Sequence, residues 1–342
     1  MRPIEIKDLY TAGGYINIPA VLDLGYKYTV IISLRGGGKT YGALQYMQDR
    51  RERFIYFRRN DRSLKLAISP DFHIFRELNE NTGHNVRPMQ VPKIGIGKFI
   101  EDEETIGYCA NLSTFASIRS IGNVKALGVK WLIFDEFIPQ ADEVRRFDLF
   151  DAWSHAEETL VRNTEIEGYE VRRLLMANTD TIRGDIVAGY RIGDAFMLMQ
   201  EGGIEALEAS EDMLLLRPGC AELAAKKADT ALYRVTSGSD FSEVALKANF
   251  LIEDRPHIKK KNMQEYRAIA AVGGVCIYKH KSRAEWYVSE TVAGKPKIYK
   301  PGEIDRARYM RENVPVWMAH LRNKIYYESL QAQTLFLRIY DL

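Results

Sequence analysis

The stretch YTVIISLRGGGKT, from Tyr28 to Thr40, decides the fold. Its first part, Tyr28 to Leu34, is an apolar run rich in β-branched residues, which predicts a buried strand. Glycines end this strand, and the segment Tyr41 to Arg51 then has the composition of a helix. A strand, a glycine-rich turn and a helix in this order predict a phosphate-binding loop, because the free N–H groups of such a turn point at phosphate oxygens.

The residues of this loop match the chemistry of ATP and Mg²⁺ binding. Gly36, Gly37 and Gly38 let the backbone approach the phosphates closely. Lys39 brings a positive charge to the β- and γ-phosphates, and Thr40 supplies a hydroxyl group to Mg²⁺. We therefore expect ATP and Mg²⁺ as cofactors.

The loop departs from the GxxxxGK[ST] pattern at its first position. The octet reads SLRGGGKT, so Ser33 stands where the pattern has glycine. Arg35 lies inside the loop, where it is positioned to sense the phosphates or a neighbouring subunit. The alternative is a glycine-rich hairpin with a chance lysine, and the apolar strand before the loop and the helix after it argue against that.

A second strand brings acidic residues. In VKWLIFDEF, residues 129–137, the apolar part Trp131 to Phe134 predicts a buried strand with Asp135 at its end. We expect Asp135 to reach the Mg²⁺ shell and Glu136 to act as the general base that polarises water. Read alone, an apolar run before Asp-Glu is equally typical of a helix N-terminus. The nearby phosphate-binding loop favours the catalytic interpretation.

The remaining elements of the first half define the fold class. Helical segments alternate with strands, which predicts a parallel α/β sheet with crossover connections. A helix is expected between Asp148 and Val161, with its large apolar residues facing the core. The further expected strands are Phe54 to Phe57, Gly107 to Leu112 and Arg173 to Ala177.

The pattern changes after a turn at Leu216 to Gly219. The segment Cys220 to Tyr233 predicts one short amphipathic helix, and Asn323 to Leu342 predicts a closing helix. Between them lie short β-prone pieces at Arg267 to His280, Glu285 to Thr291 and Lys297 to Tyr299. We therefore expect a P-loop ATPase domain over residues 1–216, a helical linker over 217–249 and a small basic β-rich domain over 250–342.

Composition is that of a folded protein, with 46% hydrophobic and 27% charged residues. The three cysteines have neither metal-ligand nor disulfide-framework spacing, which indicates a reducing compartment. No apolar stretch is long enough to span a membrane, and the start lacks a signal-peptide pattern, so neither a membrane nor export is expected. Phe250 to Leu342 holds 17 Lys and Arg residues against 10 Asp and Glu, which suits a polyanion-binding module or a solvated face.

Five motifs occur in an order that resembles one known family. ISLRGGGKT, FIYFRR, LIFDEFIP, LVRNT and LLMANT resemble the DNA-packaging ATPases, or encapsidation proteins, of phi29-like small tailed phages, from Tyr28 to about Thr179. The resemblance implies a glutamate-using ATPase core with an additional strand in its sheet, the ASCE type of P-loop NTPase. It also implies a homopentameric ring at the portal of an empty prohead, which drives double-stranded DNA inward with or without a structural RNA. Such a motor works in the cytoplasm of the infected bacterial host, transiently at the portal vertex.

The resemblance also assigns individual residues. Arg162, in LVRNT, falls where the family places an arginine finger that reaches the γ-phosphate of a neighbouring subunit. Arg119, in SIRSIGN, falls on a second basic position that the family uses across the subunit interface. Asn178, in MANT, matches the polar residue beside the attacking water. For Arg162 the alternatives of a helix cap or an ion pair with Glu157 or Glu158 stay open.

Other basic residues are candidates for contact with nucleic acid. Arg58 and Arg59 end the strand in FIYFRR, where the family also carries paired arginines, and they are candidates for contact with nucleotide or DNA, with a surface ion pair as the alternative. His257 to Lys261 (HIKKK) and Lys279 to Arg283 (KHKSR) suit a nucleic-acid backbone or the portal, and a solvated turn is the alternative.

The terminal domain resembles, in its expected strand order, a degenerate form of the RNase H-like nuclease domain of larger viral terminases. A two-metal nuclease needs a carboxylate cluster, whereas AIAAVGGVCIYKHK carries lysines and a histidine, so no nuclease activity is expected. The predicted function is an ATP-driven DNA translocase that packages a viral genome. The alternatives are a helicase-like or segregation motor, for which the chain has little room, and a nucleotide-switched portal adaptor, which would have no need of Glu136 as a base.

Overall fold

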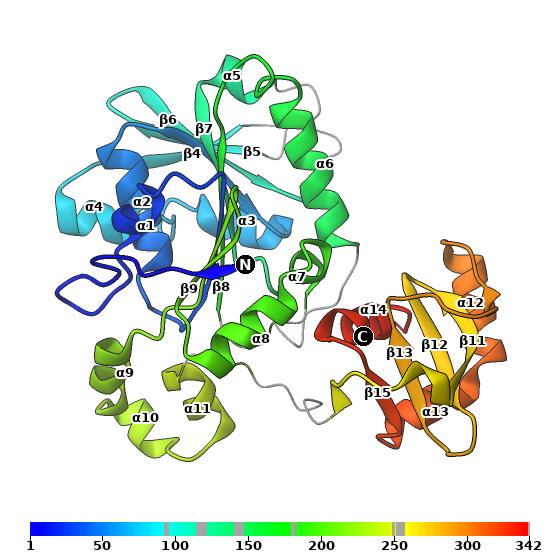
Figure 1. Cartoon of the computed structure of the whole chain (residues 1–342). Coiled ribbons are helices and arrows are strands. Elements are labelled where there is room, and N and C mark those ends of the chain that lie inside the picture. The colour runs from blue at the N-terminus through cyan, green and yellow to red at the C-terminus, as the bar shows by residue number, and fades with distance from the viewer. Residues whose placement is uncertain are drawn as a thin grey trace. The chain divides into compact units, whose positions relative to one another are not determined.

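The computed structural model of the chain describes residues 1–91, 96–113, 122–139, 147–178, 182, 184–247, 250 and 257–340. The chain forms two compact units (Figure 1). The first unit comprises Met1–Ile186 and Phe196–Phe250, and the second comprises Val187–Ala195 and Leu251–Leu342. The expected division at residues 216 and 249 stays a prediction, which separate expression of the parts would test.

The first unit is built on a ten-stranded sheet with the strand order β1-β9-β10-β2-β8-β7-β3-β6-β5-β4. The central strands from β10 to β6 run parallel, and antiparallel pairs extend the sheet at both edges. The strands are β1 (Arg2–Pro3), β2 (Tyr28–Ser33), β3 (Arg53–Arg58), β4 (Arg87–Val91), β5 (Ile96–Glu101), β6 (Glu104–Asn111), β7 (Val129–Asp135), β8 (Arg172–Asn178), β9 (Ala206–Ser210) and β10 (Met213–Leu216).

Helices cover both faces of this sheet, as a parallel sheet requires. The helices of the first unit, with two that reach into the second, are α1 (Ile18–Leu22), α2 (Lys39–Asp49), α3 (Asp61–Ala67), α4 (Arg76–Thr82), α5 (Val124–Leu127), α6 (Leu149–Val161), α7 (Asp185–Gly189), α8 (Gly193–Gly202), α9 (Ala221–Ala228), α10 (Ala231–Val235) and α11 (Asp240–Lys247).

Alternation along the strands explains why two helices take opposite faces. Tyr56 lies in the same apolar cluster as the buried residues of α2, whereas the next residue, Phe57, packs edge-on against Trp153 of α6 at 5.4 Å between ring centroids. Phe134 of β7 stacks on the same indole at 5.3 Å. Successive side chains of a strand point to opposite faces, so α2 and α6 lie on opposite sides of the sheet (Figure 1).

The register of the central strands brings their carboxyl ends level. Ser33 of β2 pairs with Asn178 of β8, and Asp135 of β7 pairs with Met176 of β8. Strand β8 therefore lies between the strand that precedes the glycine loop and the strand that ends in Asp135. This is the additional strand that the family resemblance implied, and the α/β fold class with a parallel sheet is confirmed.

The antiparallel edges were not expected from the sequence. Strands β5 and β6 are joined by Asp102 and Glu103, which both have positive φ, 48° and 65°. Two-residue turns of this kind match the twist of a hairpin, and they are usually recognised by Asn-Gly or Asp-Gly. The acidic pair carries no such signal, so the hairpin could not be read from composition.

The expectation of one helix from Cys220 to Tyr233 was wrong. The structure has α9, then a break, then α10. At the break, Thr230 takes an extended conformation with ψ at 158°, and its hydroxyl donates to the carbonyl oxygen of Lys227 at 2.8 Å. Threonine side chains that bond locally to the backbone compete with helix continuation, which explains the interruption.

The second unit holds a five-stranded sheet with the order β14-β11-β12-β13-β15 and a separate apolar core. Its hairpin between β11 and β12 turns at Gly273 and Gly274, which have φ of 57° and 83°. The β-rich character is confirmed. Its elements are the 3₁₀ turn η3 (Met263–Glu265), β11 (Tyr266–Val272), β12 (Val275–His280), β13 (Trp286–Ser289), β14 (Lys297–Ile298), α12 (Glu303–Glu312), α13 (Val314–Leu321), β15 (Ile325–Tyr327) and α14 (Leu330–Arg338).

Two sequence expectations in this unit need correction. The closing helix was expected from Asn323, but it begins only after Ser329. Ile325–Tyr327 instead form strand β15, in which Ile325 and Tyr327 are buried. The Ser329 side chain caps it by accepting from the N–H of Ala332 at 3.0 Å. Helices α12 and α13 were not expected, because their sequence is less regular in its apolar spacing than that of α6.

The cysteines Cys109, Cys220 and Cys276 are free thiols in the interior. Burial raises the pKa of each of these thiols, to about 11 for Cys220. Among the described residues, the structure has no helix that meets the length and hydropathy of a membrane span.

The α6 indole provides a test of the packing. Trp153 is fully buried between Phe57 and Phe134, so Trp153→Ala is expected to lower the free energy of unfolding by about 3–5 kcal/mol. Glu158, exposed on the same helix, is the control, and Glu158→Ala should change it by less than about 0.5 kcal/mol. Urea unfolding followed by circular dichroism measures both values. Equal effects of the two substitutions would contradict this packing.

Candidate functional site

A cleft of about 860 Å³ lies at the carboxyl ends of the central strands. Ligands of open parallel sheets bind at this edge, where the strand-to-helix loops begin. The cleft contains most of the residues expected from the sequence. Those that line it are Arg35, Gly36, Gly37, Gly38, Lys39, Thr40, Arg58, Asp135, Glu136 and Asn178.

The glycine loop has the backbone that an anion site requires. Gly36 and Gly38 have φ of 68° and 86°, a region that residues with a Cβ rarely adopt. At Gly37 a methyl group would lie 3.1 Å from Ser33 Oγ, so the serine that replaces the usual first glycine limits space inside the loop. Helix α2 starts directly after Gly38, and the positive end of its dipole faces the loop.

Lys39 is buried and its ammonium group is held inside the loop. The Nζ atom donates to the carbonyl oxygens of Ser33 at 3.2 Å and Leu34 at 2.9 Å. It also donates at 3.1 Å to Oδ1 of Asn178, the last residue of β8. A phosphate bound in the loop would compete with these three acceptors for the same cation. Lys39 and Asn178, which the sequence separates by more than a hundred residues, therefore form one unit.

Thr40 and Asp135 meet at the floor of the cleft. The Thr40 hydroxyl donates to Asp135 Oδ2 at 2.9 Å, and the Asp135 carboxylate is almost fully buried. The Tyr56 hydroxyl donates to the same oxygen at 2.5 Å. A buried carboxylate with a hydroxyl group next to it is a pair of hard oxygen donors, the ligand type that Mg²⁺ takes together with substrate phosphates.

Arg58 links the two acidic residues. Its Nη1 atom lies 2.6 Å from Glu136 Oε2, and its Nη2 atom lies 4.0 Å from Asp135 Oδ2. Burial opposes the charge of this guanidinium, but the nearby oxygens of Tyr56 and Asp135 outweigh it and raise the pKa of Arg58. Arg58 thus forms an ion pair, but a largely buried one that lines the cleft and not the surface pair considered from the sequence, and its contact with nucleotide or DNA stays a prediction.

Glu136 has an unusual backbone conformation for its residue type. Its φ is 56°, and its N–H donates to the Asp135 side chain at 3.0 Å. Left-handed conformations at non-glycine residues cluster at functional sites, because the surrounding structure must hold them in place. The Glu136 side chain is about half exposed, in contrast to that of Asp135.

Arg162 lies at the end of α6 and outside the described lining of the cleft. It is exposed, has φ of 45°, and its Nε atom donates to the carbonyl oxygen of Thr159 at 2.9 Å. Glu157, one of the partners considered for it, contacts Arg173 at 2.8 Å. Arg119 lies outside the described residues.

Sequence reasoning missed several residues of the site. Tyr56 was read only as part of an apolar strand, and its polar end gave no separate signal. The N-terminal segment contributes Thr11, Tyr15 and Asn17 to the cleft, and α4 contributes Glu77 and Asn81. These contacts depend on chain segments that come together only in the folded unit.

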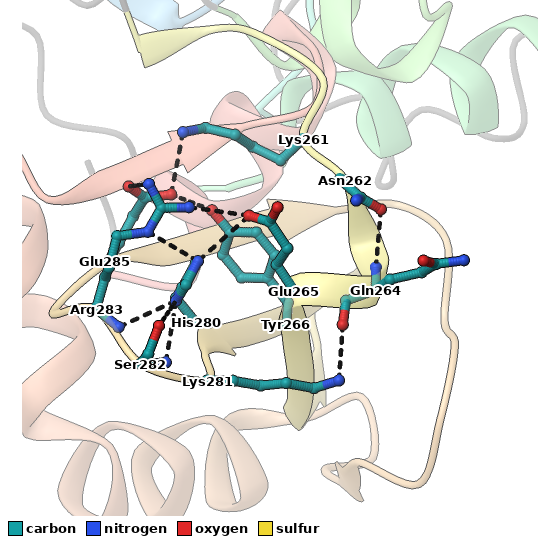
Figure 2. A network of polar contacts seen from close by, with 10 residues as sticks. All are labelled: Lys261, Asn262, Gln264, Glu265, Tyr266, His280, Lys281, Ser282, Arg283 and Glu285. Carbon is teal, nitrogen blue, oxygen red and sulfur yellow. Dashed lines mark hydrogen bonds and ion pairs between the residues drawn. The ribbon is translucent and has the colours of Figure 1, made fainter.

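Some basic side chains of the second unit, expected to form a binding surface, instead form ion pairs with acidic neighbours (Figure 2). Lys261 contacts Glu285 at 3.0 Å, and Arg283 contacts Glu265 at 2.9 Å. Two backbone N–H groups, of Ser282 and Arg283, donate to Nδ1 of the buried His280 at 3.1 and 3.0 Å.

These contacts give the KHKSR turn a fixed shape. Besides these two contacts at Nδ1, the Nε2 atom of His280 accepts from Nε of Arg283 at 2.8 Å and lies 3.3 Å from Glu265 Oε2 (Figure 2). Lys281 donates to the carbonyl oxygen of Gln264 at 2.6 Å. Lys281 and Arg283 are nevertheless exposed, as are Lys259 and Lys260 of the HIKKK run. The two runs therefore differ in partners, since Arg283 of the second run pairs with Glu265 and Lys281 with a backbone carbonyl oxygen.

Strand β2 leads into a glycine loop that holds the buried Lys39. The next residue, Thr40, contacts Asp135, which ends a strand two places away in the sheet. These features define a P-loop nucleotide-binding protein. The model of the podovirus DNA encapsidation protein (Gp16) family matches residues 14–295. The chain belongs to this family. Its function is in the packaging of phage DNA, as the sequence had indicated.

Solved structures of packaging motors have the same fold over nearly the whole chain. A chain of the bacteriophage phi29 viral genome packaging motor assembly matches with a TM-score of 0.65 and 17% identity, over 95% of this chain and 98% of that one. The phi28 gp11 DNA packaging motor matches with a TM-score of 0.62 and 15% identity, over 96% and 97% of the two chains. No curated protein matches the sequence significantly.

The buried position of Lys39 leads to a prediction about binding. Lys39→Ala is expected to weaken ATP binding by about a hundredfold, because a charge-assisted contact with the phosphates is lost. Lys125→Ala is the control, because Lys125 is exposed and pairs with Glu167 at 2.7 Å. Titration with a fluorescent ATP analogue measures both affinities. An unchanged affinity for Lys39→Ala would remove the lysine from the phosphate site.

Proposed function

We propose that the cleft hydrolyses ATP with Mg²⁺, and that Lys39, Thr40, Asp135, Glu136 and Asn178 carry the reaction. The observation that supports this most strongly is the contact of Thr40 with Asp135 at 2.9 Å, at the end of the loop that holds Lys39. Residues from the start of α2 and from the ends of β7 and β8 meet there, although the chain separates them widely. Arg35 and the glycines Gly36, Gly37 and Gly38 complete the phosphate-binding surface.

Thr40 and Asp135 fit a magnesium ion. Both offer oxygen atoms, and Asp135 is buried where solvent competes little. The described residues contain no cluster of three or more His, Cys, Asp or Glu side chains suited to a metal, so the protein would share the ion with the nucleotide. Bound Mg²⁺ supplies positive charge that stabilises the phosphoryl oxygens in the transition state.

Glu136 is the proposed general base. Its carboxylate lies in the cleft next to Asp135, and its side chain is exposed enough to take a proton from water. Asn178 is proposed to orient the attacking water. It lines the cleft, and its amide oxygen lies 3.1 Å from Nζ of Lys39, the lysine proposed to bind the phosphates. Lys39 neutralises charge on the phosphates in both the ground state and the transition state.

Arg162 and Arg119 are proposed to act on a neighbouring subunit. The exposure of Arg162 and its place outside its own cleft suit an arginine finger supplied in trans, in a homopentameric ring. The proposed partners of the ring are double-stranded DNA, the prohead portal and a structural RNA. The ring would assemble at the portal vertex in the cytoplasm of the infected host.

The most direct test of this function is a packaging assay with purified proheads, genomic DNA and ATP. DNA should become protected from added nuclease only when the chain, ATP and Mg²⁺ are all present. Removal of Mg²⁺ with a chelator should stop both protection and phosphate release, and added Mg²⁺ should restore both. Phosphate release that persists with the chelator would contradict the metal requirement.

Mixing two inactive variants tests the base and the finger together. Glu136→Gln should bind ATP and lose turnover, and Arg162→Ala should do the same for a different reason. Mixed rings contain interfaces that join an intact Glu136 site to an intact Arg162 donor, so the mixture should recover part of the ATPase activity. Phosphate release at fixed total protein measures this.

Two results would remove these assignments. A mixture as inactive as its components would place Arg162 outside the neighbouring site, as expected of a residue that only contacts the end of α6. Near-normal turnover by Glu136→Gln alone would show that Glu136 is not the base.

The second unit should bind DNA through charge and should not cut it. Lys260→Gln in the full chain should lower the slope of log affinity against log salt by about 1, since one phosphate contact is lost. Lys261→Gln is the matched control with a smaller effect, because Lys261 pairs with Glu285. Equal slopes for all three proteins would argue against this surface, and plasmid cleavage with Mn²⁺ would contradict the absence of nuclease activity.

A further inference from the structure

Helix α9 ends next to the phosphate-binding loop. Nζ of Lys227, in the last turn of α9, donates a hydrogen bond to the carbonyl oxygen of Arg35. A methyl group at Gly36 would lie 3.1 Å from the same nitrogen. Burial lowers the pKa of Lys227, so the ammonium group has exchanged part of its water for this contact.

This contact fixes the direction of a peptide group in the loop. In a trans peptide the C=O and the following N–H point in opposite directions, and the described residues contain no cis peptide. The hydrogen bond from Lys227 to Arg35 therefore turns the N–H of Gly36 away from α9. Gly36, with φ of 68° and no Cβ, would otherwise allow this peptide to flip at low cost.

The N-terminal segment strengthens the link between α9 and the loop. On one side it is bound to the start of α9, where the N–H of Cys220 donates to the Tyr10 hydroxyl at 3.2 Å. On the other side it is bound to the loop, where the N–H of Ile16 donates to the carbonyl oxygen of Gly37 at 3.0 Å. The loop and α9 are thus connected both directly and through a shared neighbour.

We propose that Lys227 is a positioning residue that holds the phosphate-binding loop in its binding conformation and couples the nucleotide site to α9. The inference rests on the proposed function, since the ligand it concerns is the nucleotide at Lys39. Coupling of this kind is reciprocal. If the contact of Lys227 with Arg35 raises the affinity for nucleotide, then nucleotide stabilises this contact of α9 by the same free energy.

Three variants of the full chain test the proposal. Lys227→Met removes the donor and keeps most of the aliphatic stem, and it should raise the dissociation constant for a fluorescent ATP analogue about tenfold. Lys227→Arg retains a donor and should stay within about threefold of the natural protein. Lys226→Met is the matched control on the same helix, because Lys226 pairs with Glu222 at 2.6 Å, and it should change affinity less than about twofold.

Hydrogen exchange supplies a readout that a purely structural role would not move. In the natural chain, saturating nucleotide should slow the amide exchange of residues 221–228. In Lys227→Met, saturated with the same nucleotide, this slowing should be lost while the thermal midpoint without nucleotide stays unchanged. The measurement on the natural chain does not depend on whether any variant folds.

The outcomes separate the inference from the function on which it rests. If the natural chain binds the analogue through Lys39 but nucleotide leaves exchange over 221–228 unchanged, the coupling is overturned. Lys227→Met with natural affinity and natural exchange response would overturn it as well. If the natural chain binds no analogue, the proposed nucleotide site fails first and the inference with it.

Discussion

The parallel register of β2, β8 and β7 is the constraint on which the site depends. Ser33 pairs with Asn178, and Asp135 pairs with Met176, so three strands end at nearly the same level. A shift of one residue in any of these pairs would turn every side chain of that strand to the other face of the sheet. Lys39 would then lose Asn178, and Thr40 would lose Asp135.

The amino ends of the same strands carry a buried polar network that supports this register. Arg173 of β8 is almost fully buried and contacts Glu157 of α6 at 2.8 Å and Glu165 at 2.6 Å. The Tyr28 hydroxyl donates to Glu157 as well, so β2, β8 and α6 are joined at one point. Buried pairs of this kind add little net stability, but a misaligned strand would leave Arg173 without them. The network therefore favours one alignment, and it also fixes the helix that ends in Arg162.

The sequence was informative where a local pattern has a single physical meaning. The run from Tyr28 to Thr40 predicted a strand, a loop and a helix, and all three are present within two residues of their expected bounds. The strand that ends at Asp135 was also predicted, but its apolar run was equally typical of a helix N-terminus, and only the nearby phosphate-binding loop decided between the two. The position of this strand next to β8, in contrast, was expected only from the family resemblance.

What could not be predicted depends on contacts between distant segments. The hydrogen bond of Tyr56 to Asp135 and that of Lys227 to Arg35 have no local signal, because each joins segments that the chain order does not relate. The division of the segment after Cys220 into two helices depends on one threonine, Thr230, whose side chain bonds to the backbone. Strand β15 was mistaken for part of a helix because three residues are too few to establish a period.

The burial of all three cysteines makes this chain suited to optical measurement. Burial raises the pKa of the thiols of Cys109, Cys220 and Cys276, so each is both shielded and largely in the unreactive thiol form at neutral pH. A maleimide dye would therefore react far faster with a cysteine introduced on the surface than with the native ones. Two such dyes, one on each compact unit, would report the distance between the units in single molecules while ATP is consumed, without first removing any native thiol.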